Sequence, residues 1–319
     1  MLNKTIQDWA SLAADLDIEG RAFINGRYVD ALAGGTRETV SPGNGQKLAD
    51  VANCGIEDAD HAVAIARAAF ESGVWANRAP ADRKMVLVRW AELIEEHADE
   101  IALLECLDVG KPISDTTGVD VPSAVRTIRW SGEAIDKVYD EIPPTPADTL
   151  ALVQRLPLGV VAAIVPWNFP LSTTAWKLAP SLATGNSVIL KPASNTPLSA
   201  LRIAGLATEA GLPDGVLQVL PGPGGSLGRH LSLHEDIDGL TFTGSTEIGK
   251  QLMRYSGESN LKRTFLELGG KSPNIVFADS NLEKAATFAA IAVFYNGGQT
   301  CTAGTRLIVE DSIRERFVE

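Results

Sequence analysis

The chain has 319 residues, of which 45% are hydrophobic and 21% charged, so it can bury a sizeable core and is long enough for two domains. Its 28 basic residues against 40 acidic ones give a net charge of −12, which argues against nucleic acid as a partner. Three scattered cysteines form no disulfide framework and no paired metal-ligand spacing, so we expect a reducing compartment and no metal site.

Residues 1–20 lack the apolar core of a signal peptide and no stretch reaches the length of a membrane helix, so we expect a cytoplasmic protein without a membrane partner.

The first 140 residues are predicted to be mainly helical. Residues 22–30 predict a small edge hairpin that turns at Asn25-Gly26. Apolar residues at helical spacing predict helices over 58–70 and 82–98, a third that ends at Gly110, and a fourth over 122–139.

Residues 140–159 are predicted to project from the body as an arm. Prolines in EIPPTPAD (141–148) exclude a regular helix, and ALVQRLPLG (151–159) predicts a strand that leaves this loop. Such an arm can pair with another subunit, which would make it an oligomerisation element. An ordinary surface hairpin is the alternative, because edge strands are often simply blunted.

From residue 160 the pattern becomes regular. Short apolar, β-branched segments alternate with helical ones, which predicts an α/β fold with a parallel sheet covered by helices on both faces. The predicted strands are 160–166, 187–192, 216–222, 239–244 and 264–268, and the predicted helices are 170–183, 197–210, 224–233 and 246–256.

A second α/β unit is predicted to begin at residue 266. It has a strand over 274–278, a helix over 281–295, a strand over 305–310 and the start of a helix at Asp311-Ser312, and the chain ends at Glu319. A domain usually needs about 100 residues. We therefore expect 266–319 to be the amino-terminal part of a domain whose remainder is absent.

Polar residues and glycines follow several of the predicted strands. Ligands bind at the carboxyl ends of strands in open parallel sheets, so these residues are candidates for a site. Each has a structural alternative: Asn168 and Ser245 can cap helices, Lys191 can be solvated, and Glu267, which is costly in its apolar run without a partner, can belong to an ion pair. The candidates at the four strand ends are Trp167, Asn168 and Phe169; Lys191 and Ser194; Gly244 and Ser245; and Glu267, Leu268 and Gly269.

Cys301 lies among small polar residues in NGGQTCT (296–302), after the predicted helix 281–295. A cysteine acts as a nucleophile in the thiolate form, and preceding glycines let the backbone approach whatever the sulfur attacks. An intracellular cysteine is more often a small buried hydrophobe, and we interpret Cys54 and Cys106 in that way.

Taken together and in this order, the motifs resemble those of the aldehyde dehydrogenase superfamily, and the resemblance extends from Phe23 onward. It implies a Rossmann-variant sheet, with 1–139 and 160–265 as an NAD(P)-binding domain, 140–159 as an oligomerisation arm and 266–319 as the start of the catalytic domain. The matching motifs are PWNFP (166–170), ILKPAS (189–194), FTGSTEIG (242–249), LELGGKSPNIVF (266–277) and GGQTCTAGTR (297–306).

The resemblance also implies a mechanism of aldehyde oxidation to a carboxylic acid. Cys301 attacks the aldehyde, and the Asn168 amide with the Cys301 N–H holds the oxyanion of the thiohemiacetal. Hydride passes to the nicotinamide and leaves a thioester, after which Glu267 activates the water that releases the acid. Lys177 is similar to the lysine that supports this proton path in the family.

The same resemblance assigns cofactor and substrate residues. NAD is expected, and NADP stays open because Ser194 stands where many NAD-preferring members have a glutamate. The LECLDVGKP and AWKLAP runs are closest to the ω-aminoaldehyde branch, such as γ-glutamyl-aminobutyraldehyde and guanidinobutyraldehyde dehydrogenases. The expected cofactor residues are Trp167, Lys191, Ser194, Gly224, Gly244, Ser245, Leu268 and Gly269, and the expected substrate residues are Asp108, Phe169 and Trp176.

Several alternatives remain open from the sequence. Phe169 and Trp176 can be ordinary core aromatics. A CoA-acylating relative would pass the acyl group from Cys301 to CoA, although Glu267 argues against it. Family members continue beyond Glu319 and are expected to be homodimers or homotetramers, so the chain can also be a truncated, non-catalytic fragment that binds a nucleotide or a partner.

Overall fold

A computed structural model describes residues 4–319; the first three residues of the predicted amino-terminal segment lie outside the described part. Its centre is a seven-stranded sheet in the order β2-β1-β7-β6-β5-β8-β9. Five strands are parallel, and the β1–β2 hairpin joins them at one edge in antiparallel orientation, so the predicted α/β sheet is confirmed. The strands are β1 (Ala22–Ile24), β2 (Arg27–Val29), β5 (Val160–Ile164), β6 (Ser187–Lys191), β7 (Leu217–Val219), β8 (Gly239–Gly244) and β9 (Arg263–Leu268).

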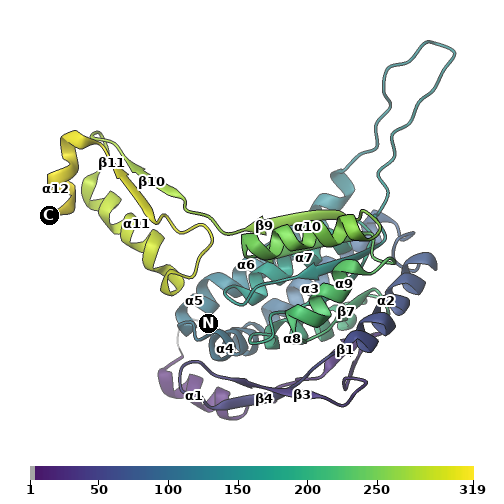
Figure 1. Cartoon of the computed structure of the whole chain (residues 1–319), viewed down its shortest axis with the longest axis horizontal. Helices are drawn as coiled ribbons and strands as arrows, with labels where there is room; N and C mark the ends of the chain where they lie inside the picture. Colours follow the sequence, from purple (N-terminus) through teal and green to yellow (C-terminus); the bar gives the residue numbers. More distant parts are fainter. Residues whose placement is uncertain (1–3) are drawn as a thin grey trace.

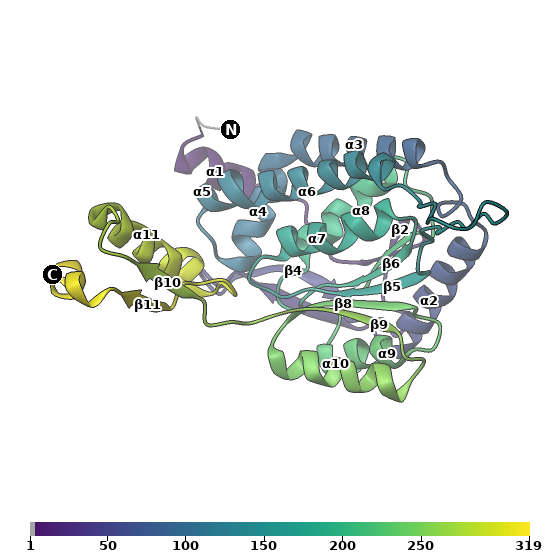
Figure 2. The same ribbon diagram turned by 90° about the horizontal axis from the view of Figure 1, so that it is seen from above.

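Helices cover both faces of this sheet (Figures 1 and 2). Residues of β6 show why: Val188 and Leu190 pack into the core on one side, and Ile189 packs into the core on the other. Alternate residues of a strand point to opposite faces, so an apolar run buries both. One face carries α3 (Pro80–Glu96), α4 (Ala98–Val109), α6 (Val121–Ala134), α7 (Pro170–Ala183) and α8 (Leu198–Glu209), and the other carries α2 (Ile56–Glu71), α9 (Arg229–Leu233) and α10 (Thr246–Glu258).

The prediction that the first 140 residues are mainly helical missed one sheet. An antiparallel pair, β3 (Thr36–Val40) and β4 (Lys47–Ala52), stands apart from the main sheet. Most of its side chains are exposed or half-buried, so the pair has almost none of the apolar alternation by which a strand is recognised. The amino-terminal segment forms α1 (Ile6–Ala14), capped by Thr5.

Two predicted helices have different ends in the structure. The helix predicted over 122–139 is α6, which ends at Ala134 and is followed by a 3-10 turn over Ile135–Lys137. A short helix α5 (Ile113–Asp115) and a π-helical turn over Thr116–Asp120 precede it. The helix predicted over 224–233 begins as a π-helical turn over Gly224–Gly228 and continues as α9.

Residues 140–159 project from the body as a long hairpin (Figure 1). The predicted strand over 151–159 is wrong, because the arm contains a single β-bridge, between Glu141 and Val153. Apolar side chains on the arm, including Ile142, Leu150, Leu152 and Leu156, are exposed. That the arm pairs with another subunit stays a prediction.

The carboxyl-terminal segment lies beside the main body rather than on its sheet (Figures 1 and 2). It contains a parallel pair, β10 (Pro273–Val276) and β11 (Arg306–Val309), with α11 (Leu282–Phe294) between them and α12 (Arg314–Val318) after them. The domain boundaries proposed from the sequence remain predictions. Within residues 4–319, no helix has the length and hydropathy needed to span a membrane.

Candidate active site

A cavity of about 840 Å³ lies at the carboxyl ends of β5, β8 and β9, where the main body meets the carboxyl-terminal segment. Its lining residues come from the β5–α7 turn, the ends of β8 and β9, the π-helical turn over Thr116–Asp120 with the start of α6, and the segment after α11. Ten of the residues predicted from the sequence line it: Trp167, Asn168, Phe169, Trp176, Gly244, Ser245, Glu267, Leu268, Gly269 and Cys301.

The segment that carries Cys301 turns sharply after α11. Asn296, Gly297 and Gly298 have φ values of 53°, 63° and 77°, in the left-handed region that glycine adopts without steric cost and that asparagine tolerates. These residues reverse the chain, so Cys301 lies half-buried in the cavity wall. The sequence NGG is therefore the local reason that Cys301 lies at the cavity wall.

Asn168 fixes this segment to the main body. Its Nδ2 donates to the Gln299 carbonyl at 2.6 Å, and its own carbonyl accepts from Asn296 Nδ2 at 3.1 Å. An amide nitrogen carries two hydrogens, so the second remains available to a ligand in the cavity. Asn168 thus combines a structural contact with a free donor beside the cysteine segment.

Glu267 lines the cavity, but its environment differs from the expectation. From the sequence Glu267 is expected to lie in an apolar run, where it would be costly without a partner, whereas its side chain is exposed. β9 is the edge strand of the sheet, and alternate residues from Arg263 to Leu268 face outward. An exposed carboxylate at the cavity wall needs no ion-pair partner and can accept a proton from water.

Lys177 lies on α7, outside the cavity lining. Its Nζ donates to the Phe242 carbonyl at 3.5 Å. Burial lowers the pKa of Lys177, and the negative charge of Glu267 opposes that shift. Lys177 is therefore near enough to Glu267 to feel its charge, which is compatible with the expected supporting role.

Aromatic rings form much of the remaining wall. Phe169 and Tyr295 stack with centroids 6.3 Å apart, and Trp167 and Trp176 are exposed towards the cavity. Phe169 and Trp176 therefore border the cavity, and the alternative that they are ordinary core aromatics is not what the structure shows. Tyr295 was not predicted, since nothing in the sequence marks it before the fold places it against Phe169.

The turn from β8 to α10 provides an anion-binding geometry. Ser245 caps α10 by accepting the N–H of Ile248 at 3.3 Å, and the free N–H groups of a helix start attract phosphate. A Cβ at Gly244 would lie 2.3 Å from the Phe242 ring, so only glycine fits there. The Thr243 hydroxyl beside them is buried and has no hydrogen-bond partner among the described residues.

Three further cofactor candidates lie outside the cavity, near the ends of β6 and β7. Lys191 is buried, and its Nζ donates to the Pro192 carbonyl at 2.8 Å. Burial lowers its pKa to about 8. Ser194 donates to the Gly222 carbonyl at 2.8 Å, and a Cβ at Gly224 would meet no atom within 4 Å, which leaves open space beside that turn.

Asp108 does not face the cavity, and its predicted substrate role is wrong on this point. Its carboxylate is buried in the main body, where it accepts the Thr39 hydroxyl at 2.9 Å and the Leu198 N–H at 3.0 Å. Burial raises its pKa to about 7. Asp108 therefore caps the start of α8 and ties it to β3, a contact hidden in the sequence because β3 was not predicted.

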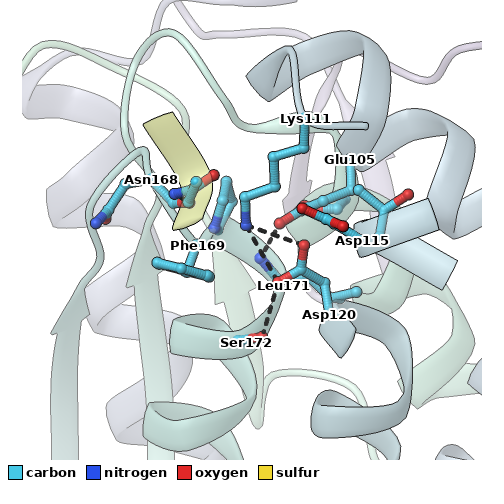
Figure 3. A network of polar contacts seen from close by, with 12 residues as sticks. Glu105, Lys111, Asp115, Asp120, Asn168, Phe169, Leu171 and Ser172 are labelled. Atoms are coloured by element: carbon cyan, nitrogen blue, oxygen red, sulfur yellow. Dashed lines mark hydrogen bonds and ion pairs between the residues drawn. The ribbon is translucent and has the colours of Figure 1, made fainter. Parts of the chain in front are cut away.

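Behind the cavity lies a polar network that is not predicted from the sequence. Lys111 pairs with Asp120, and Glu105 accepts the Leu171 N–H at 3.2 Å and the Ser199 hydroxyl at 2.7 Å (Figure 3). Burial raises the pKa of Glu105 to about 7. The LECLDVGKP run (104–112) therefore supplies residues that support the cavity wall from behind.

The other two cysteines behave as structural residues. Burial raises the pKa of Cys54 to about 12 and also raises the pKa of Cys106. A thiol in such a setting stays protonated and unreactive at neutral pH. Cys301 is the cysteine that lines the cavity.

One group of metal-ligand residue types, Asp60, His230 and His234, lies away from the cavity. Both histidines direct Nε2 at Asp60 Oδ1, at 2.5 and 3.4 Å. The Asp236 N–H donates to His234 Nδ1 at 3.1 Å, so neutral His234 carries its hydrogen on Nε2 and that atom is not free to bind a metal. The contacts within this group link α2 to the end of α9.

Comparisons with known proteins agree with this geometry. A sequence profile described as the aldehyde dehydrogenase family matches residues 28–319. The chain is 55% identical over 311 residues to the NADP/NAD-dependent aldehyde dehydrogenase PuuC of Escherichia coli K12, covering 97% of this chain and 63% of that protein. It is 48% identical over 314 residues to the aminoacetaldehyde dehydrogenase of Pseudomonas aeruginosa, covering 98% and 63%.

A solved structure agrees as well. It is that of a cysteine-to-alanine mutant of the P. syringae indole-3-acetaldehyde dehydrogenase AldA in complex with NAD+ and IAA. Its TM-score is 0.98 at 58% identity, covering 99% of this chain and 64% of that one. The chain spans 63% of the length of the two curated relatives. On the profile match, the identity and the shared fold, this chain belongs to the aldehyde dehydrogenase family.

Proposed function

We propose that this protein oxidises an aldehyde to a carboxylic acid with NAD+ or NADP+. One observation carries the proposal: Cys301, Asn168 and Glu267 come from three different elements and line the same cavity. A nucleophile, an amide donor and a carboxylate base are the groups that acyl chemistry through a thioester requires.

Each of these residues has a defined part in the proposed reaction. The Cys301 thiolate adds to the aldehyde carbon and forms a thiohemiacetal, whose oxyanion accepts the free Asn168 N–H and the backbone N–H of Cys301. Glu267 then takes a proton from the water that attacks the Cys301 thioester and releases the acid. Its exposure at the edge strand gives water access to it.

The residues present fit a dinucleotide. The capped start of α10 and Gly244 suit its pyrophosphate, and the unpartnered Thr243 hydroxyl lies beside them. Lys191 and Ser194 lie at the end of β6, which β5 separates from β8, and we expect a ribose to contact them there. When bound, the dinucleotide supplies the acceptor for the hydride that turns the thiohemiacetal into the thioester. PuuC is described as NADP/NAD-dependent. Ser194 carries no negative charge to repel a 2′-phosphate, so both cofactors are proposed.

An ω-amino or guanidino aldehyde is the proposed substrate class. Phe169, Trp176 and Tyr295 line the cavity. Phe169 is already in contact with Lys111 and Tyr295, so the exposed Trp176 ring is the aromatic group we expect to attract the cationic tail of the substrate. The aminoacetaldehyde dehydrogenase relative is named for an aldehyde of this kind.

The experiment is to follow NADH formation by the purified protein with wild-type Glu267 and with Glu267→Gln. The variant is expected to release about one NADH per active site and then turn over about 10² to 10⁴ times more slowly, because the general base is lost. Glu258→Gln, an exposed glutamate at the end of α10, is the matched control and keeps the wild-type rate.

Two further comparisons complete this experiment. Assays with NAD+ and with NADP+ define the cofactor, and an aminoaldehyde against a neutral aldehyde of the same length defines the substrate class. The alternative, a CoA-acylating enzyme, predicts an acyl-CoA product and little effect of Glu267→Gln. Wild-type turnover by that variant, or turnover that requires CoA, contradicts the proposal.

A further inference from the structure

Lys111 carries a buried positive charge directly behind one wall of the cavity. It follows Gly110, the left-handed residue that ends α4, and its side chain is 2% exposed. Its ammonium lies 3.1 and 2.9 Å from the two carboxylate oxygens of Asp120 (Figure 3). Asp120 is fully buried and belongs to the residues that line the cavity.

The same ammonium faces an aromatic ring of the site. Its nitrogen lies 3.7 Å from the centroid of the Phe169 ring, and Figure 3 shows Lys111 reaching between Phe169 and Asp120. A desolvated cation over a ring face is a strong contact. Phe169 also stacks on Tyr295, the first residue of the 295–301 segment that carries Cys301. The Lys111 ammonium therefore restrains a ring that contacts this segment.

Phe169 is the next residue after Asn168, so its position determines where the Asn168 backbone lies. Asn168 in turn holds the cysteine segment through Gln299 and Asn296. A continuous chain of contacts therefore runs from the Lys111 ammonium to the residues that precede Cys301.

We propose that Lys111 is a positioning residue for the reaction of this site: it holds Phe169, and thereby orients the Asn168 amide and the 295–301 segment. The inference rests on the proposed function for its kinetic consequences. Stability alone is a weak reason for such a pair, because a buried ion pair is often no more stabilising than apolar residues of similar size. Glu105 has its own partners, Leu171 and Ser199, and does not need Lys111 for its hydrogen bonds.

The test uses the double variant Lys111→Met and Asp120→Asn, since Lys111→Met alone leaves the buried Asp120 carboxylate without a compensating charge, with only the Ser172 hydroxyl at 3.5 Å as a partner. Lys262→Met is the matched control. Lys262 is also buried, and its Nζ donates to the Ser232 carbonyl at 2.9 Å and the Ser259 hydroxyl at 2.7 Å, away from the cavity. Both proteins are compared with the wild type by amide hydrogen exchange over 295–301, by the rate at which iodoacetamide alkylates Cys301, and by kcat and KM.

In the double variant we expect exchange over 295–301 and alkylation of Cys301 to become about tenfold faster, the size expected for loss of a desolvated cation–π contact. We expect kcat to fall by about tenfold while KM stays within about twofold, because the Asn168 donor acts mainly in the transition state. Phe169→Leu is expected to give the same exchange pattern, and combining it with the double variant adds nothing further.

The opposite results overturn the inference. Unchanged exchange and alkylation in the folded double variant, or equal changes in Lys262→Met, show that Lys111 has a general structural role. If the wild-type protein does not oxidise aldehydes, the proposed function fails, whereas exchange and alkylation still decide the role of Lys111. If hydrogen exchange and alkylation become faster in the double variant but kcat does not fall, Lys111 holds the 295–301 segment without affecting the reaction, and its role as a positioning residue is refuted.

Discussion

Replacing Asn168 by aspartate removes a donor without changing the shape of the side chain. In the structure, Nδ2 donates one hydrogen to the Gln299 carbonyl at 2.6 Å and has a second for the oxyanion. Loss of an oxyanion donor costs about 10² to 10³ in kcat, or about 2.7–4 kcal/mol of transition-state stabilisation. A carboxylate facing the Gln299 carbonyl also leaves that carbonyl with only the longer contact from Asn296 Nδ2, at 3.4 Å, which costs at most about 1–3 kcal/mol of local stability.

The assay separates these two effects. Steady-state kinetics of Asn168→Asp report the chemical loss, with KM expected to stay close to the wild-type value because the donor acts mainly on the oxyanion. Thermal unfolding and iodoacetamide alkylation of Cys301 report the loosened segment. Asn260→Asp is the control, because Asn260 Nδ2 also donates to backbone carbonyls, those of Glu235 at 2.7 Å and Ile237 at 2.9 Å. A kcat for Asn168→Asp within about threefold of the wild type would show that Asn168 is not the oxyanion donor.

Two further predictions concern stability and assembly. Burial raises the pKa of Glu105 and of Asp108 to about 7, so between about pH 4 and pH 7 the folded chain holds protons that the unfolded chain releases. This contribution to stability is complete below pH 4 and is lost as the pH rises through 7, so the urea midpoint should be higher at pH 5 than at pH 8. Glu105→Gln should reduce this difference. An equal difference in both proteins contradicts the assignment of the pH dependence to Glu105. Leu152→Asp with Leu156→Asp on the arm, where the leucines are 60% and 79% exposed, should lower the mass measured by light scattering if the arm pairs two copies. Leu32→Asp, at a leucine 63% exposed on the body, serves as its control, and an unchanged mass in the arm variant refutes pairing through these leucines.

Local patterns in the sequence are sufficient for much of the fold. The apolar runs of β5, β6 and β8 alternate with helices, and a parallel sheet covered on both faces buries both sides of each strand, so the pattern predicts it directly. The site residues at strand ends follow for the same reason, since parallel strands bring their carboxyl ends to one edge. Asn168 and Ser245 are predicted in this way, whereas Cys301 is predicted from its small polar neighbours after the helix over 281–295. The polar pair β3–β4 was missed, because exposed strands have no apolar period to detect.

Tertiary structure alone decided the environment of each side chain. Glu267 is exposed because it lies on the outward face of the edge strand β9, whose other face is half-buried, and neither the order of strands nor the covering of a face can be read from one strand. Asp108 is turned from the cavity by contacts with Thr39 and Leu198, at separations of 69 and 90 residues. Lys111 lies in the loop after α4 and Asp120 in the π-helical turn over Thr116–Asp120, so their contact with each other and that of Lys111 with Phe169 form only when these segments pack together. Sequence thus determined which groups are available and on which elements they lie; burial, partners and orientation depend on long-range packing.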